Sequence, residues 1–192
     1  MYNGLINVYK EPGFTSMDAV AVLRGILKQK KIGHTGTLDP AAEGVLMVCL
    51  GNATKLCSFL EDKDKEYECR MLLGVETDTE DTTGQEISRR KIVMGESGDG
   101  DSLCLSEELI KEAIMSFKGN IKQVPPMYSA LKIDGKKLYE LARKNREIER
   151  PKQPITVREM ELISHHGNEI IFRTVCSTGT YVRVLIEDIA EA

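Results

Sequence analysis

The chain has 192 residues, 41% of them hydrophobic, which is enough for one substantial core with a small lobe, so we expect one main domain. Its net charge of −4 argues against a uniformly basic nucleic-acid-binding domain, so any contacts with nucleic acid would have to come from local basic clusters. Its five cysteines form no CxxC pair and its aliphatic runs are too short to cross a membrane, which argues against zinc knuckles, disulfide frameworks and membrane anchors and favours the reducing cytoplasm.

The first third of the chain predicts a helix, a buried strand and a short helix. Thr15 and Asp18 have the spacing of a capping box. The apolar residues on one face of the helix that follows are Ala19, Val22, Leu23, Ile26 and Leu27. This helix should end before Gly33. The apolar run at 45–50 is typical of a fully buried strand, and 53–60 of a short helix.

The middle of the chain predicts a half-buried strand and then a surface excursion. Residues 66–73 alternate apolar and polar side chains, with Tyr67, Cys69, Met71 and Leu73 on one side. Residues 76–101 are polar and loop-rich, with a brief strand around 90–94 and a flexible tip at 95–100.

The last part of the chain predicts two helices, two strands and a final helix. Ser106 caps a helix that Gly119 ends, and residues 138–146 could form a basic helix. The remaining elements are strands near 156–163 and 169–177 and a helix over 184–190. Together these elements predict an α+β fold with a mixed, mainly antiparallel sheet flanked by helices.

One carboxylate lies between turn-forming glycines and the predicted buried strand. The segment Gly33-His34-Thr35-Gly36-Thr37-Leu38-Asp39-Pro40 is followed by Gly44. Pro40 biases Asp39 away from helical geometry, and a carboxylate in a tight loop beside an apolar strand could be partly desolvated. Asp39 is therefore a candidate reactive group, although the Asp-Pro pair also fits an ordinary turn.

Basic residues cluster at Lys28 to Lys31, at 89–91 and across 132–150. These clusters could form one surface that binds phosphate groups, or they could be separate solvent-exposed helix faces and loops. The sequence does not decide between these two interpretations.

Five blocks in the same order resemble the TruB family of tRNA pseudouridine synthases. They are Val8-Tyr9-Lys10-Glu11-Pro12-Gly13 with Ser16; Gly33 to Pro40 with Gly44-Val45-Leu46, Cys49-Leu50-Gly51 and Ala53-Thr54-Lys55; Lys65-Glu66-Tyr67; Pro125 to Lys132 with Gly135, Leu138-Tyr139 and Ala142-Arg143; and Cys176 to Arg183. The resemblance implies a pseudouridine synthase fold. It also implies an enzyme that isomerises uridine 55 in the T loop of tRNA, with base flipping and without cofactor or metal.

The resemblance also implies roles for particular residues. Asp39 would be the essential carboxylate, paired with Arg183, and Tyr67 would stack on the flipped uracil. His34 would help extrude the base, and Tyr181 would pack beside the pocket and orient Arg183. Lys10 and Lys132 would support loop or phosphate contacts, although structural roles fit Lys10 and Tyr181 equally well.

The remaining expectations concern the insertion, the partners and the end of the chain. By resemblance, residues 123–152 form a mobile RNA-gripping insertion of a monomer that binds the T arm of tRNA without an obligatory protein partner. Glu43, where relatives have a small or hydroxylated residue, should face solvent. The end at Ala192 resembles a truncation of the 1–192 catalytic domain that omits a small RNA-binding domain of PUA type. Alternatives are an RNA-binding module or tRNA chaperone with weak activity, and the related guide-RNA-dependent class.

Overall fold

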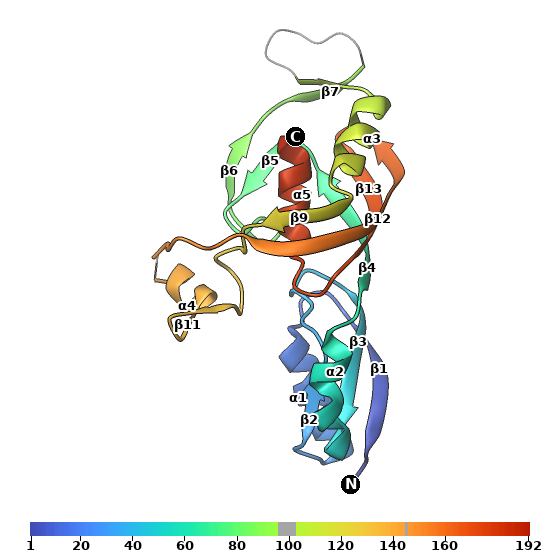
Figure 1. Cartoon of the computed structure of the whole chain (residues 1–192), viewed down its shortest axis with the longest axis vertical. Helices are drawn as coiled ribbons and strands as arrows, with labels where there is room; N and C mark the ends of the chain where they lie inside the picture. Colours follow the sequence, from blue (N-terminus) through green and yellow to red (C-terminus); the bar gives the residue numbers. More distant parts are fainter. Residues whose placement is uncertain (96–102, 145) are drawn as a thin grey trace. The chain divides into compact units, whose positions relative to one another are not determined.

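The computed structural model describes residues 1–95, 103–144 and 146–192 (Figure 1). The chain divides into two compact units, Met1–Lys63 and Asp64–Ala192, which are described separately below as the N-terminal and C-terminal units. Apart from Gly95, the predicted flexible tip at 95–100 lies outside the described residues.

The N-terminal unit is a three-stranded antiparallel sheet with helices. The strand order is β1–β3–β2, with β1 at Gly4–Lys10, β2 at Ile32–His34 and β3 at Gly44–Leu50. Helix α1 (Ser16–Leu27) connects the first two strands, and the 3-10 helix η1 (Gly51–Leu56) and helix α2 (Cys57–Glu61) follow β3. Its core contains Val20, Ile32, Leu46, Val48 and Leu50.

Helix α1 begins as predicted but buries a different face. Thr15 accepts a hydrogen bond from the Asp18 amide, and the Asp18 carboxylate accepts one from the Thr15 amide, which confirms the capping box. The predicted face was wrong in part, because Val22 and Ile26 are 51% and 68% exposed while Val20 is fully buried. The buried side of α1 is therefore rotated toward Val20.

The C-terminal unit is built on a four-stranded antiparallel sheet in the order β4–β13–β12–β9. The strands are β4 (Lys65–Leu72), β9 (Gly119–Gln123), β12 (Gln153–His166) and β13 (Glu169–Cys176). Helix α3 (Glu107–Ser116) packs on β12, and α5 (Val182–Glu191) packs on β4 and α3. Strands β4, β12 and β13 and both helices were predicted.

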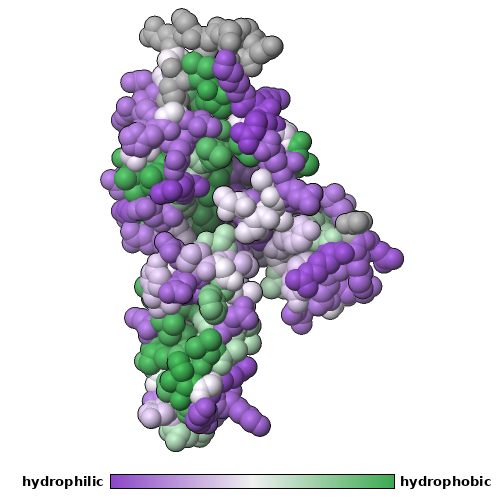
Figure 2. Space-filling model, turned by 180° about the vertical axis from the view of Figure 1, so that it is seen from behind, coloured by the Kyte–Doolittle hydropathy of each residue, from purple (hydrophilic) through white to green (hydrophobic). Residues whose placement is uncertain are grey.

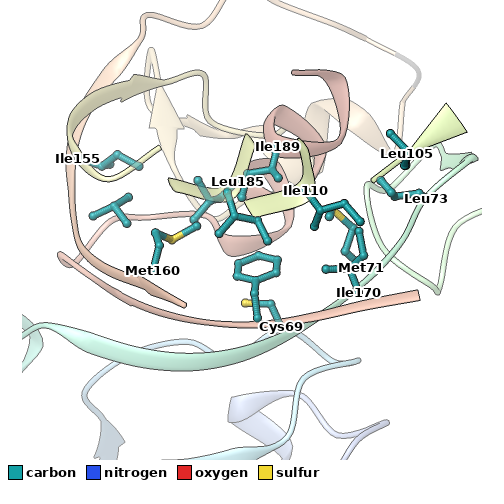
Figure 3. Packing of buried hydrophobic residues seen from close by; sticks show 13 residues of the cluster. Cys69, Met71, Leu73, Leu105, Ile110, Ile155, Met160, Ile170, Leu185 and Ile189 are labelled. Carbon is teal, nitrogen blue, oxygen red and sulfur yellow. The ribbon is translucent and has the colours of Figure 1, made fainter. Parts of the chain in front are cut away.

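The core of the C-terminal unit lies between this sheet and the two helices. Figure 3 shows Ile110 of α3 and Leu185 of α5 gathered with Cys69 and Ile170 of the sheet. Phe172, fully buried, belongs to the same cluster. Burial of one such apolar side chain contributes about 1.5–3 kcal/mol, so this cluster is the main reason that α5 is held on the sheet.

Short elements complete the C-terminal unit. They are β5 (Val75–Thr77), β6 (Glu86–Arg89), β7 (Ile92–Met94), β8 (Leu103–Leu105), β10 (Lys132–Ile133), β11 (Lys136–Lys137) and α4 (Leu138–Ala142). The β5–β6 hairpin adds two strands to the segment predicted as a loop-rich excursion, while β7 confirms the brief strand. The predicted basic helix ends at Ala142, short of residue 146.

The predicted fold class is confirmed, since both main sheets are antiparallel and carry helices. Figure 2 shows large apolar side chains at the surface of the N-terminal unit, and Tyr9, Val45 and Phe59 are among its exposed hydrophobic residues. Among the residues that the structure describes, no helix combines the length and apolar character needed to span a membrane.

Candidate functional site

The loop that carries Asp39 is fastened on both sides of the carboxylate. The Ser16 hydroxyl donates to the Leu38 carbonyl at 3.2 Å and accepts from the Leu38 amide at 3.0 Å. The Pro40 carbonyl accepts from the Gly13 amide at 2.8 Å. Asp39 is itself half-buried, and its carbonyl closes a turn with Ala42. The loop therefore holds this carboxylate in a defined place, which a reactive group requires.

Gly44 is the residue at which the loop becomes strand β3. Its φ is +132°, a conformation that L side chains rarely adopt, and an added Cβ would meet nothing within 4 Å. The need for glycine here is thus a matter of backbone conformation and not of space.

Lys10 is a buried lysine that holds the turn after β1 and interacts electrostatically with Asp39. It ends β1, is 1% exposed, and its Nζ donates to the carbonyls of Phe14 at 2.7 Å and Glu11 at 3.1 Å. Burial lowers the pKa of Lys10, while the carboxylates of Asp39 and Glu43 act in the opposite direction. Lys10 thus has a structural role in the neighbouring loop and adds a positive charge near Asp39.

His34 and Glu43 lie at the two ends of the loop. His34 is half-buried, and its Nδ1 lies 2.7 Å from the Gly36 carbonyl, which can only accept, so this nitrogen carries the proton of the bond. Glu43 is exposed, as predicted, and bonds the Tyr9 hydroxyl, which raises the pKa of Tyr9. Glu43 is therefore engaged at the surface.

Tyr67 lies on β4 in the C-terminal unit, on the same side as Cys69 and Met71. It is half-buried and packs against the core cluster, opposite Thr174 of β13. The structure thus gives its ring a packing role at the edge of the core, and its contact with a nucleobase stays a prediction.

Arg183 lies in the first turn of α5 and is 9% exposed. Its guanidinium donates to the Thr79 carbonyl at 3.3 Å and to the Tyr128 carbonyl, and its Nη1 lies 4.0 Å from the Asp81 carboxylate. Three segments distant in the sequence are thus joined by one planar cation. Such multiple bonding in fixed directions is what a guanidinium provides and an ammonium does not.

Asp81 is a site residue that the sequence did not reveal. Burial raises its pKa, but hydrogen bonds from Thr83 and Thr79 and the charge of Arg183 outweigh burial and lower the pKa overall. The Thr83 amide and the Thr79 hydroxyl lie 2.8 and 2.9 Å from its Oδ1. Asp81 therefore remains ionised beside the Arg183 guanidinium.

Glu80 is a buried acid beside the same arginine. Its Oε2 is buried and has no hydrogen-bond partner within the part of the chain that the structure describes, and its φ is +60°. The pKa of Glu80 is raised to about 7, chiefly by burial and then by the Glu187 carboxylate, with a smaller contribution from Asp188. The positive charges of Arg183 and Arg150 act in the opposite direction. The fold therefore favours the protonated form of Glu80.

Replacing Glu80 by glutamine should change how stability depends on pH. Because the pKa of Glu80 is higher in the folded chain than in the unfolded chain, its favourable contribution is complete below about pH 4.5 and is lost as pH rises through about 7. After allowance for solvent screening, Glu80 should lower the free energy of unfolding of the wild-type chain by roughly 1–2 kcal/mol between pH 5 and pH 8. Glu80→Gln should not show this part of the decrease. Urea unfolding at both pH values measures it, and parallel pH profiles would contradict it.

A cleft of about 370 Å³ lies in front of the Arg183 anchor points. Thr79 and Tyr128, whose carbonyls accept from Arg183, both line it, together with Glu80, Arg146 and Arg150. The cleft thus joins the β5–β6 hairpin to the segment around 126–150. Among the described residues no cluster of histidine, cysteine or acidic side chains could hold a metal ion.

The segment from β10 to α4 presents basic and aromatic side chains. Lys132 is exposed, and the Tyr139 ring has Lys137 Nζ and Arg143 Cζ each 5.3 Å from its centroid. Leu138, fully buried, anchors α4, and its amide donates to the Leu131 carbonyl. This part of the chain is hydrophilic over the face that Figure 2 shows.

The predicted site residues fall into two sets, one in each unit. Asp39, Lys10 and His34 belong to the N-terminal unit, whereas Tyr67, Tyr181, Arg183 and Lys132 belong to the C-terminal unit. Within the first unit, Lys10 is electrostatically coupled to Asp39. The predicted pairing of Asp39 with Arg183 stays a prediction.

Comparison with known proteins identifies the family. The chain is 48% identical over 189 residues to "tRNA pseudouridine synthase B" of Alkaliphilus oremlandii and 47% identical over 196 residues to that of Bacillus licheniformis. These alignments cover 98% and 100% of the chain but 60% of each relative, so the chain spans about three-fifths of their length.

Solved structures agree with the sequence comparison. The chain is 31% identical to one chain of the structure described as "Crystal Structure of a Cbf5-Nop10-Gar1 Complex", with a TM-score of 0.70, covering 98% of this chain and 44% of that one. A second match, to "Structure of H/ACA RNP bound to a substrate RNA containing 2'-deoxyuridine", has a TM-score of 0.66 and 28% identity, covering 98% and 42% of the two chains. Residues 24–182 match the model of the N-terminal domain of the TruB family pseudouridylate synthases, and the chain therefore belongs to that family.

Proposed function

We propose that this chain forms most of the catalytic domain of an enzyme that isomerises uridine to pseudouridine at position 55 in the T loop of tRNA. The observation that carries the proposal is the Asp39 loop, in which bonds to Leu38 and Pro40 fix a half-buried carboxylate next to a buried lysine. The names of relatives 46–48% identical support tRNA as the substrate.

The reaction is an isomerisation in which the C1'–N1 bond of uridine breaks and a C1'–C5 bond forms. The proton on C5 is lost to solvent and N1 gains one, so atoms balance without an added reagent. The target nucleotide must leave its stack to reach a protein carboxylate. Asp39 acts at the sugar or the base, and His34 at the start of the loop assists extrusion.

The family resemblance is the ground for proposing roles for Arg183 and Tyr67 as well. At about 4 Å and an effective dielectric near 20, attraction between the Arg183 guanidinium and the Asp39 carboxylate would be about 4 kcal/mol before desolvation. The Tyr67 ring would stack on the uracil face and leave its edges accessible.

The segment 123–152 is proposed to grip the T arm. Its exposed lysines, including Lys132, and the Tyr139 ring with the Lys137 and Arg143 cations near it suit phosphate and base contacts. Because phosphate neutralisation releases counterions, affinity should fall steeply with salt.

A guide-RNA-dependent activity is the second candidate, favoured by the likeness to the Cbf5 complexes. The identity to the tRNA enzymes, 48% against 31%, supports the stand-alone reaction. An RNA-binding module or chaperone with little isomerase activity is the third candidate, and the anchored Asp39 loop argues against it.

Release of tritium from a T-arm stem-loop labelled at C5 of uridine tests the proposal. The chain alone and the chain extended with the remaining C-terminal part of the Alkaliphilus oremlandii relative are assayed without added subunits or guide RNA. Release at position 55 is expected. Binding of the stem-loop without release by either protein would favour the chaperone, and release only with guide RNA and partner proteins would favour the Cbf5-like class.

A further inference from the structure

The side chain of Gln123 is clamped to the backbone of one residue far along the chain. Gln123 ends β9 and is 2% exposed. Its Nε2 donates to the Tyr181 carbonyl at 3.0 Å, and its Oε1 accepts from the Tyr181 amide at 2.9 Å. One carboxamide thus satisfies both backbone groups of Tyr181.

Tyr181 is the N-cap residue of helix α5, directly before the first helical residue Val182. Among the described residues, the Tyr181 side chain makes no capping hydrogen bond to this helix. The Tyr181 carbonyl also accepts from the Leu185 amide at 3.0 Å, which forms the first turn of the helix. The Gln123 clamp therefore fixes where α5 begins in place of a local cap. Arg183 lies in that first turn, with its guanidinium against the carbonyls of Thr79 and Tyr128.

Gln123 also lies at the base of the segment 123–152. Its backbone pairs with Gln153 in the β9–β12 register, and Pro125 and Tyr181 line a second cleft of about 280 Å³. The same clamp thus ties the start of α5 to both ends of the segment proposed to grip RNA.

We propose that Gln123 is a positioning residue for the isomerisation, acting through the Tyr181 backbone to place the Tyr181 ring and the Arg183 guanidinium. This inference rests on the proposed function. The clamp needs one donor and one acceptor on the same side chain. Leucine supplies neither, and an ionised glutamate supplies only acceptors.

The N-terminal unit contains a matched clamp that serves as control. Gln29 is 7% exposed, its Oε1 accepts from the Tyr2 amide at 2.7 Å, and its Nε2 donates to the Tyr2 carbonyl at 3.0 Å. Its Nε2 also donates to the Lys31 carbonyl at 3.1 Å. Gln29 is thus a buried carboxamide that, like Gln123, bonds both backbone groups of one distant residue, but the backbone it holds carries none of the proposed site residues.

The first experiment compares Gln123→Leu with Gln29→Leu in the tritium-release assay. Gln123→Leu should lower kcat by about 10- to 100-fold, because small displacements of catalytic groups cost up to about 10² in rate, with KM for the stem-loop nearly unchanged. Gln29→Leu should leave kcat within about twofold, although both variants should unfold at a lower temperature because each loses the hydrogen bonds of a buried carboxamide to the backbone. Equal losses of kcat would overturn the proposal.

The second experiment uses Gln123→Glu and Gln29→Glu as conservative replacements. A protonated glutamate can donate to the Tyr181 carbonyl while accepting from the Tyr181 amide, and burial favours the protonated form. The ratio of Gln123→Glu to wild-type kcat should therefore rise as pH falls from 8 to 6, whereas the ratio for Gln29→Glu should be flat. A flat ratio for Gln123→Glu would contradict the donor requirement.

Amide hydrogen exchange separates failure of this inference from failure of the proposed function. If the wild-type protein releases no tritium, the proposed function fails, but the clamp is still tested by exchange at residues 181–185. Gln123→Leu should speed exchange there at least about tenfold, and Gln29→Leu should not, since local opening exposes only the unclamped segment. Unchanged exchange in Gln123→Leu would overturn the placement of α5 by Gln123.

Discussion

Asp39→Asn is expected to abolish tritium release, lowering kcat by at least about a thousandfold, while affinity for the T-arm stem-loop stays within a few-fold. Asparagine keeps the volume and removes the charge and the nucleophilic or basic oxygen pair at one half-buried point. The loop should remain in place because the substitution leaves intact its anchors through the Ser16 hydroxyl and the backbone of Leu38 and Pro40.

Asp62→Asn is the matched control for this substitution. Asp62 is exposed at the end of α2 in the same unit, so the same chemical change there should alter neither rate nor affinity. Single-turnover release and filter binding are measured for both variants, with thermal unfolding to confirm that each is folded. An Asp39→Asn protein that keeps most of its rate would transfer the essential role to another group.

The elements that sequence predicted well are those whose signals are local. The capping box at Thr15 and Asp18 and the alternation around Cys69 need only a few neighbouring residues to be read. The buried face of α1 was misplaced because Val22 and Ile26 are apolar yet exposed, and helical spacing alone does not say which of two overlapping stripes meets the sheet. The β5–β6 hairpin was missed because its strands are short and largely exposed.

The candidate site shows the same division between local and distant signals. The Asp39 segment carries its own turn chemistry, so a resemblance could identify it. The contacts of Arg183 with Thr79 and Tyr128 join residues 104 and 55 positions apart, and the Gln123 clamp joins residues 58 positions apart. No short pattern encodes such pairs, and Asp81 and Gln123 therefore became visible only in three dimensions.

Arg183→Lys should be the second most damaging substitution, lowering kcat by about 100-fold while the protein stays folded. The guanidinium reaches two carbonyls and lies beside the Asp81 carboxylate, with 9% of its side chain exposed. A lysine keeps the charge but cannot direct donors to all three groups at once, so at least one buried acceptor loses its bond at a cost of about 1–3 kcal/mol. Filter binding of the stem-loop gives its affinity for the variant, and tritium release gives kcat.

Arg173→Lys is the control that separates a specific effect of Arg183 on turnover from the general effect of replacing an arginine that has several partners. Arg173 also has three partners, the carboxylates of Glu66, Glu159 and Glu161 on strands β4 and β12, at 3.2, 2.7 and 3.3 Å. Those partners are exposed, so solvent can replace the missing bonds and the loss of stability should be below about 1 kcal/mol. If both lysine variants lower kcat equally, Arg183 acts through general stability of the sheet and helix. A loss confined to Arg183→Lys means that the directed donors of this guanidinium are what turnover requires.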